Sequence, residues 1–136
     1  MKQDPTSITR HEGDMRCHTK YSPSQATFTT DVASSLGGRG EFPSPGDMLA
    51  SCLASCMLSM IAYTGARKEF NTRGISIEAA CSEGSRGVGS ICLDIHVPMP
   101  CPPAMRRVLQ AAAESCPVAA SLHPEVEKKV TWHWAE

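Results

Sequence analysis

A long uncharged stretch dominates the pattern of hydrophobic and polar positions along the chain. Residues 48–66 contain no Asp, Glu, Lys or Arg. Just before them, Ser44 is a favourable N-cap, Pro45 suits the first helical position, and Asp47 follows the cap by three residues. The pattern predicts one helix over residues 44–70, roughly 35–40 Å long at 1.5 Å per residue. Because this helix would be apolar on every side, it needs cover from a sheet, a second copy of the chain or lipid.

The length of this run meets the threshold for a membrane span, but its composition favours a buried core helix. It contains several alanines and three serines at four-residue spacing, Ser51, Ser55 and Ser59. Such small residues would let a second helix approach closely, so a two-fold dimer is one way to cover the helix. We therefore expect a homodimer and no membrane association.

The remaining segments alternate or show helical spacing. Strands are predicted, from their alternation and composition, in residues 8–21 (with a turn near Glu12), 25–32, 75–82, 90–97 and 126–134. A second helix is predicted over residues 104–115, ended by Pro117, with one more turn at 118–122. Strands joined as hairpins predict an α+β fold with a mostly antiparallel sheet and helices on one face. The length predicts a single domain over residues 1–136.

Composition narrows the classes of function. The formal net charge is −1, from 13 basic and 14 acidic residues, which gives no indication of nucleic-acid or anionic-membrane binding. The segment MKQDPTSITR lacks the apolar core of a signal peptide. With seven cysteines, an odd number, we expect free thiols in a reducing compartment and a cytoplasmic location.

Two cysteines occupy distinctive positions. Cys56 lies near the centre of the long helix, and Cys116 directly precedes Pro117, 60 residues further along the chain. A peroxide-reducing enzyme needs one thiolate to attack the O–O bond and a second thiol to resolve the resulting sulfenic acid. Alternatively, these cysteines pack as small hydrophobic residues. A third possibility is a metal site with Cys52, Cys56 and Cys116 as ligands, although the chain has no paired zinc-type motif.

Three stretches of the sequence resemble the OsmC/Ohr family, the osmotically inducible protein C and organic hydroperoxide resistance proteins. They are SPGDMLASCLASCML, the predicted hairpin after it, and AAAESCPVAASLHPEV. The segments TTDV and GRGEFPSP fit an OsmC-like subgroup, and the resemblance covers nearly the whole chain. The ordered pair of motifs, a Pro-led helix with a central Cys and a later CPV, is its most specific element.

The resemblance implies an α+β OsmC-like fold in which antiparallel sheets wrap around two central helices of an intertwined homodimer. Cys56 matches the family's peroxidatic cysteine and Cys116 its resolving cysteine. The implied reaction is the two-electron reduction of an organic hydroperoxide to an alcohol, as part of oxidative-stress defence. A thiol reductant protein or small dithiol would restore the enzyme, and neither a metal nor another cofactor would take part.

The sequence departs from the family pattern at the start of the long helix. The well-characterised branch has Glu directly after the Pro, where this chain has Gly46. Asp47 is the nearest acid and also fits a capping box. The candidates for the family's active-site arginine are Arg39, Arg16 and Arg86. The alternative function is a redox-sensing or small-molecule-binding dimer of the same fold without efficient peroxidase activity.

Overall fold

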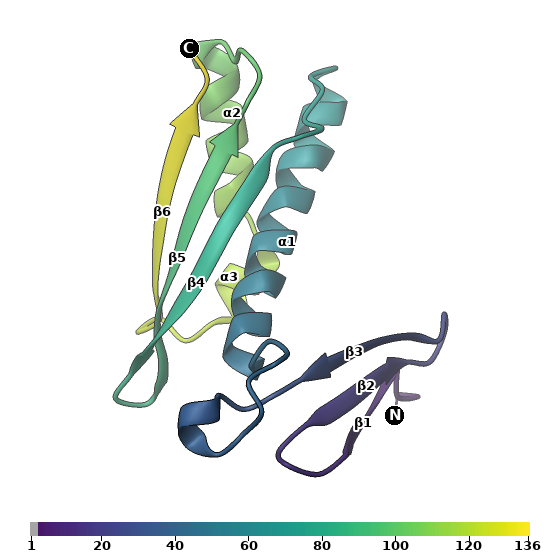
Figure 1. Cartoon of the computed structure of the whole chain (residues 1–136). Coiled ribbons are helices and arrows are strands. Elements are labelled where there is room, and N and C mark those ends of the chain that lie inside the picture. Colours follow the sequence, from purple (N-terminus) through teal and green to yellow (C-terminus); the bar gives the residue numbers. More distant parts are fainter. Residues whose placement is uncertain (1–2) are drawn as a thin grey trace. The chain divides into compact units, whose positions relative to one another are not determined.

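The computed structural model describes residues 3–136 and divides the chain into two compact units. The boundary falls after Met48, in the first turn of helix α1 (Pro45–Arg67), and each unit is described by itself. The secondary structure is α+β, as predicted (Figure 1). The prediction that residues 1–136 form a single domain stays a prediction.

The first unit holds an antiparallel three-stranded sheet in the order β1-β2-β3. Its strands coincide with the two predicted segments, except that β1 begins one residue earlier: β1 (Ser7–His11), β2 (Cys17–Tyr21) and β3 (Ala26–Thr30). A 3-10 turn, η1 (Ser34–Leu36), and the glycine-rich loop then lead to α1.

The start of α1 is fixed by a reciprocal capping box within this first unit. The backbone N–H of Asp47 donates to Ser44 Oγ at 3.1 Å, and the N–H of Ser44 donates to Asp47 Oδ2 at 3.0 Å. Two N–H groups that the helix itself cannot satisfy are thereby paired. The capping role predicted for Asp47 is confirmed.

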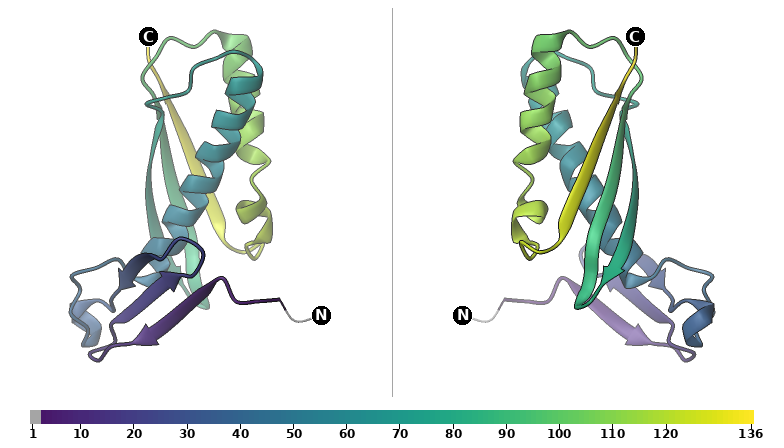
Figure 2. Two further views of the ribbon diagram at one scale, coloured as in Figure 1. Left: turned by 90° about the vertical axis from the view of Figure 1, so that its right-hand side faces the viewer. Right: turned by 90° about the vertical axis from the view of Figure 1, so that its left-hand side faces the viewer.

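The second unit is a three-stranded sheet in the order β4-β5-β6 with helices on one face (Figure 2). Its elements after α1 are β4 (Ser76–Gly84), β5 (Gly87–Val97), α2 (Pro103–Glu114), α3 (Pro117–Ser121) and β6 (Glu127–Trp134). The inward side chains of central strand β5 are at most 1% exposed: Ile91, Leu93, Ile95 and Val97. They form one core with Leu53 and Ile61 of α1 and Leu109 of α2.

One strand pairing differs from the expected antiparallel sheets. Strand β5 pairs antiparallel with β4, but β6 runs parallel to β5, with His96 opposite His133. The physical reason is the connection, since α2 and α3 lie between β5 and β6 and carry the chain back across the helical face. A parallel pair requires such a crossover, whereas a tight turn permits only an antiparallel one.

The hairpin of β4 and β5 is also longer than the predicted strands over residues 75–82 and 90–97, which left residues 83–89 as the turn. Strand β4 continues to Gly84 and β5 already begins at Gly87, which leaves a two-residue turn between them. A Cβ on Gly84 would lie 2.9 Å from the Cα of Gly89 on the facing strand. The glycines of this segment therefore permit a close approach of two backbones.

Within residues 3–136, α1 is the one helix long and apolar enough to cross a membrane by length and composition. The core helix of a water-soluble protein meets the same criterion. Only 33% of its most apolar window is buried within the chain. The helix therefore keeps an extensive exposed surface of small and apolar residues.

Candidate redox site

The structure brings Cys56 and Cys116 together in the second unit. Cys56 is half-buried in the middle of α1, and Cys116 lies between α2 and α3 with 1% of its surface exposed. Both are free thiols that pack on the same core. Burial raises the pKa of the Cys116 thiol, and hydrogen bonding to the neighbouring Cys56 raises it further.

The position of Cys116 follows from the local sequence. Pro117 takes the first position of α3, as its fixed φ favours, and Cys116 is the extended residue before it, with φ −61° and ψ 120°. Its Sγ accepts a hydrogen bond from the backbone N–H of Ala119 at 3.4 Å. The amides of Ala119 and Val118 favour the thiolate and so oppose the rise in the Cys116 pKa. The predicted helix break at Cys116 is confirmed.

Two adjacent cavities of about 370 and 360 Å³ lie between α2 and strand β6. Both are lined by Met57, the residue after Cys56, together with Ala113, Glu114 and Val130. The first also reaches Ala119, whose N–H contacts Cys116. Neither cysteine lines these partly apolar cavities, which are linked to the site through Met57 and Ala119.

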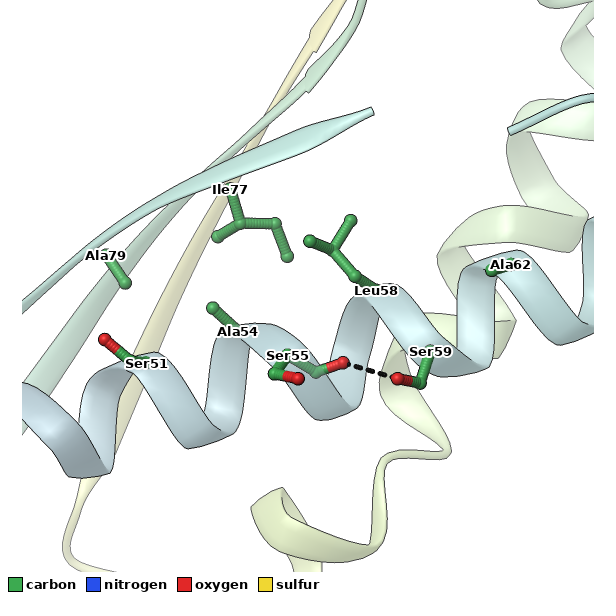
Figure 3. A pocket seen from close by; sticks show the side chains of 8 residues that line it. All are labelled: Ser51, Ala54, Ser55, Leu58, Ser59, Ala62, Ile77 and Ala79. Carbon is green, nitrogen blue, oxygen red and sulfur yellow. Dashed lines mark hydrogen bonds between the residues drawn. The ribbon is translucent and has the colours of Figure 1, made fainter. Parts of the chain in front are cut away.

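A larger, shallow groove of about 550 Å³ runs between α1 and β4 and contains neither cysteine (Figure 3). The three serines at four-residue spacing, Ser51, Ser55 and Ser59, line it on the helix side. Ser59 Oγ donates to the carbonyl oxygen of Ser55 at 2.8 Å, so its polar group is satisfied within the helix. The floor is completed by apolar side chains of both elements: Ala54, Leu58, Ala62, Ile77 and Ala79.

The other cysteines occupy varied environments. Cys52 lies one turn before Cys56 on α1 and is exposed. Cys101 is buried, and this burial raises the pKa of its thiol. The remaining three are half-buried: Cys17, Cys81 and Cys92. Among residues 3–136, no three or more His, Cys, Asp and Glu side chains are placed to hold a metal ion.

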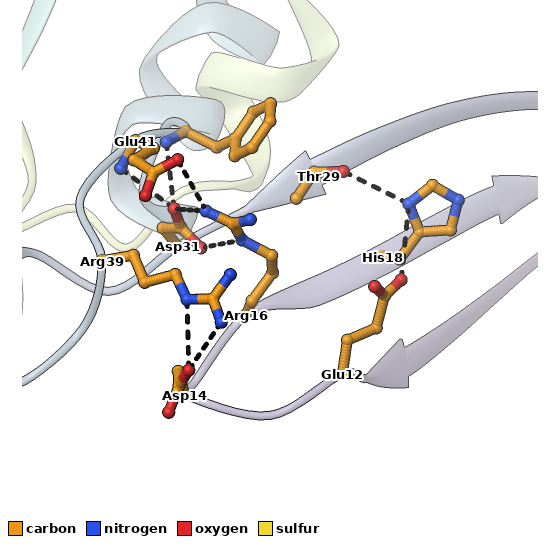
Figure 4. Close-up of polar contacts among 9 residues, drawn as sticks. Glu12, Asp14, Arg16, His18, Thr29, Asp31, Arg39 and Glu41 are labelled. Carbon is orange, nitrogen blue, oxygen red and sulfur yellow. Dashed lines mark hydrogen bonds and ion pairs between the residues drawn. The ribbon is translucent and has the colours of Figure 1, made fainter.

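The three candidate arginines have different surroundings. Arg39 forms an exposed ion pair with Asp14, with 2.7 Å between Nη2 and Oδ2 (Figure 4). Arg86 is exposed in the turn between β4 and β5. Arg16 is 15% exposed and forms a two-pronged hydrogen-bonded ion pair with Asp31. The catalytic roles predicted for Arg39 and Asp47 stay predictions.

Sequence reasoning missed Asp31 as the centre of this polar cluster. Its carboxylate accepts two hydrogen bonds from Arg16, each 2.8 Å, and two from the backbone N–H groups of Glu41 and Phe42 at 3.0 and 3.1 Å. The Arg16 guanidinium also lies 4.7 Å from the centre of the Phe42 ring. Through these hydrogen bonds, Asp31 holds Glu41 and Phe42 in place in the segment that precedes α1. The only signal for Asp31 in the sequence was the position of this acid directly after a strand rich in Thr.

Hydrogen bonding from Arg16 lowers the pKa of Asp31 to about 2, from an ordinary 3.8, and the two amides add to this against the effect of burial. The ionised Asp31 therefore stabilises the fold above about pH 4, and this contribution is lost as the pH falls from about 4 through 2. We expect Asp31→Asn to lower the free energy of unfolding at pH 7, and its difference from wild type to shrink below pH 4. Urea unfolding between pH 7 and 2.5 measures this.

The matched control is Asp14→Asn, which removes the exposed partner of Arg39. Exposed ion pairs contribute little to stability, so this variant should stay close to wild type at every pH. A wild-type minus Asp31→Asn difference that does not change with pH would contradict the role assigned to the Asp31 charge.

Two histidines on the outer face of the β4-β5-β6 sheet stack against each other. His96 and His133 stack with ring centroids 4.5 Å apart, and His133 Nε2 lies 2.8 Å from Asp94 Oδ1. Their side chains are 40% and 46% exposed on the outer face of the sheet. This pair lies on the sheet face opposite the core-facing side chains of β5 and contributes nothing to the cysteine site.

The profile of the family described as OsmC-like protein matches residues 38–131, which contain both site cysteines. The chain belongs to this family. The resemblance seen in the helix and CPV motifs is thereby confirmed. Among curated proteins, no sequence match was found.

Solved structures of OsmC and Ohr proteins share the fold of this OsmC-like chain. A putative osmotic stress induced and detoxification response protein from Psychrobacter arcticus is 29% identical, with 98% of each chain covered and a TM-score of 0.94. The organic hydroperoxide resistance protein OsmC of Legionella pneumophila is 20% identical, covering 96% of this chain and 98% of that one, with a TM-score of 0.73. The organic hydroperoxide resistance protein OhrB of Bacillus subtilis is 16% identical, covering 93% of this chain and 96% of that one, with a TM-score of 0.66.

Proposed function

We propose that this OsmC-like protein is a thiol-dependent peroxidase that reduces organic hydroperoxides through Cys56 and Cys116. The observation that carries the proposal is the placement of a half-buried Cys56 against a buried Cys116 in one core. Two thiols so arranged can exchange a sulfenic acid for a disulfide without a large rearrangement. The names of the structural relatives from Legionella pneumophila and Bacillus subtilis, both organic hydroperoxide resistance proteins, support the same chemistry.

The reaction has two steps at the protein. The Cys56 thiolate attacks the terminal oxygen of the hydroperoxide, the O–O bond breaks, and the departing alkoxide takes a proton to give the alcohol. Cys56 is then a sulfenic acid. The Cys116 thiolate attacks its sulfur, hydroxide leaves and is protonated to water, and a Cys56–Cys116 disulfide forms. An external dithiol returns both cysteines to thiols.

The difference in burial between the two cysteines supports this order of their roles. Peroxide must reach the attacking sulfur from solvent, and Cys56 is the more accessible of the pair. Cys116 is buried and its pKa is raised, so it is protected from direct oxidation and is held ready beside Cys56. The partly apolar cavities next to Met57 suit an alkyl group better than a small polar peroxide.

We also propose that the protein acts as a homodimer in the cytoplasm. The α1 groove is lined by small and apolar side chains, and only a third of the helix's most apolar window is buried by the chain itself. A second copy whose α1 packs on this groove would bury that surface. A monomeric sedimentation profile at micromolar concentration would contradict the dimer.

The function is tested by the kinetics of the reduced protein with cumene hydroperoxide and with hydrogen peroxide, followed by steady-state turnover with dihydrolipoamide as the dithiol. We expect rapid, saturable consumption of cumene hydroperoxide and at least about tenfold slower consumption of hydrogen peroxide. Slow oxidation at similar rates by both peroxides would overturn the peroxidase. That result would favour the redox-sensing or ligand-binding dimer, for which Gly46 in place of the family's Glu is the sequence argument.

A further inference from the structure

The two sulfurs of the site differ sharply in their access to solvent. Cys116 is 1% exposed, whereas Cys56 is half-buried on α1, one turn after the exposed Cys52. Cys56 is not among the residues that line the α1–β4 groove proposed for a second copy. The disulfide state would retain this asymmetry, because the S–S bond would form between the two side chains where they already lie.

We infer that the reducing thiol attacks the sulfur of Cys56, and that Cys116 is always the leaving group. This inference rests on the proposed function, since it concerns how the Cys56–Cys116 disulfide is reduced. Thiol–disulfide exchange depends on which sulfur the attacking thiolate can reach. The attacking thiolate approaches in line with the bond that breaks. Attack on Cys116 would therefore have to come through the core that encloses it, whereas attack on Cys56 comes from the other side of the bond.

Reduction of the disulfide takes two thiol–disulfide exchanges. The thiolate of an external dithiol bonds to Cys56 Sγ, the S–S bond breaks, and Cys116 departs with the electron pair. Cys116 then takes a proton from water to become a buried thiol. The second thiol of the dithiol attacks the sulfur that is bonded to Cys56, releases the Cys56 thiolate and closes the oxidised dithiol.

The surroundings of Cys116 affect the rate of this step but not its direction. The Ala119 N–H, 3.4 Å from Sγ, stabilises the departing thiolate. Burial acts the other way and raises the Cys116 pKa, which makes Cys116 a slower leaving group. A slow leaving group reduces the rate of attack at Cys56, but an enclosed sulfur cannot be attacked at all until the fold opens.

The test begins with a disulfide made without peroxide. The whole protein is oxidised with diamide, and peptide mass mapping establishes whether Cys56 and Cys116 are joined. The monothiol glutathione is then added, the exchange is stopped with acid within seconds, and free thiols are alkylated. We expect glutathione on Cys56 and the alkylating label on Cys116, with at least about a tenfold excess over the reverse arrangement.

A control in urea isolates the role of burial. In the unfolded, oxidised chain both sulfurs are accessible, so the excess on Cys56 should fall toward equal labelling. In the folded protein, glutathione mainly on Cys116, or shared equally between the two, would overturn the inference and leave the peroxidase intact. If diamide forms no Cys56–Cys116 disulfide, the proposed pairing itself fails and the inference fails with it.

Discussion

The Cys56→Ser variant is expected to lose turnover of organic hydroperoxides, by at least about 10³-fold in kcat/KM. A serine hydroxyl is not ionised at neutral pH and does not attack the O–O bond, whereas a cysteine thiolate does. The substitution exchanges sulfur for oxygen at a half-buried position, so the fold should remain. The measurement is the steady-state consumption of cumene hydroperoxide with dihydrolipoamide as reductant.

Cys52→Ser is the matched control for this variant. Cys52 lies one turn earlier on the same helix, is exposed, and undergoes the same exchange of atoms. It should keep a rate close to that of the wild type and an unchanged melting temperature. Retention of turnover by Cys56→Ser, or an equal loss in both variants, would remove Cys56 from the role of attacking thiol.

The Cys116→Ser variant is expected to reduce one equivalent of hydroperoxide at close to the wild-type rate and then to stop. Without a neighbouring thiol, the Cys56 sulfenic acid persists and further peroxide converts it to sulfinic acid. Intact mass spectrometry after successive additions of cumene hydroperoxide should show this product accumulating on Cys56. Repeated cycling of this variant with no sulfinic acid would contradict the resolving role of Cys116.

A serine at position 116 would also bury a hydroxyl group, which costs roughly 1–3 kcal/mol when its hydrogen bonds are incomplete. The single-turnover measurement should therefore be repeated with Cys116→Ala, which buries no polar group. Both variants lack the resolving thiol and should give the same overoxidation. Only Cys116→Ser should carry the cost of the buried hydroxyl, which thermal unfolding reports.

The sequence predicts those parts of the fold that depend on local pattern. Ser44, Pro45 and Asp47 together define the start of α1, and the capping box is formed as predicted. The alternation in residues 90–97 identifies the inward face of β5, which is fully buried in the structure. These features are local because a cap or a strand face depends on residues a few positions apart.

Features that depend on contacts between residues distant in sequence could not be predicted from local patterns. The alternation of β6 is compatible with either strand direction, and only the crossover through α2 and α3 makes its pairing with β5 parallel. The buried position of Asp31 depends on Arg16 and on the amides of Glu41 and Phe42, which no spacing rule connects. A lone acid in a sequence is usually exposed.

The same distinction between local and long-range features applies to the candidate site. The helix break at Cys116 and the central position of Cys56 in α1 follow from the positions of Pro117 and Pro45. That the two cysteines meet could not be obtained from a separation of 60 residues, and only the family resemblance paired them. In the structure their proximity arises because α1 and α2 pack on the same face of one sheet.

Mapping the oxidised cysteines after a single turnover tests the central claim most directly. One equivalent of cumene hydroperoxide is added to the fully reduced protein, the remaining thiols are alkylated, and the peptides are identified by mass. The account predicts a Cys56–Cys116 disulfide as the main product, with the other five cysteines alkylated. Oxidation spread over all seven cysteines, or a disulfide that excludes Cys56, would contradict it.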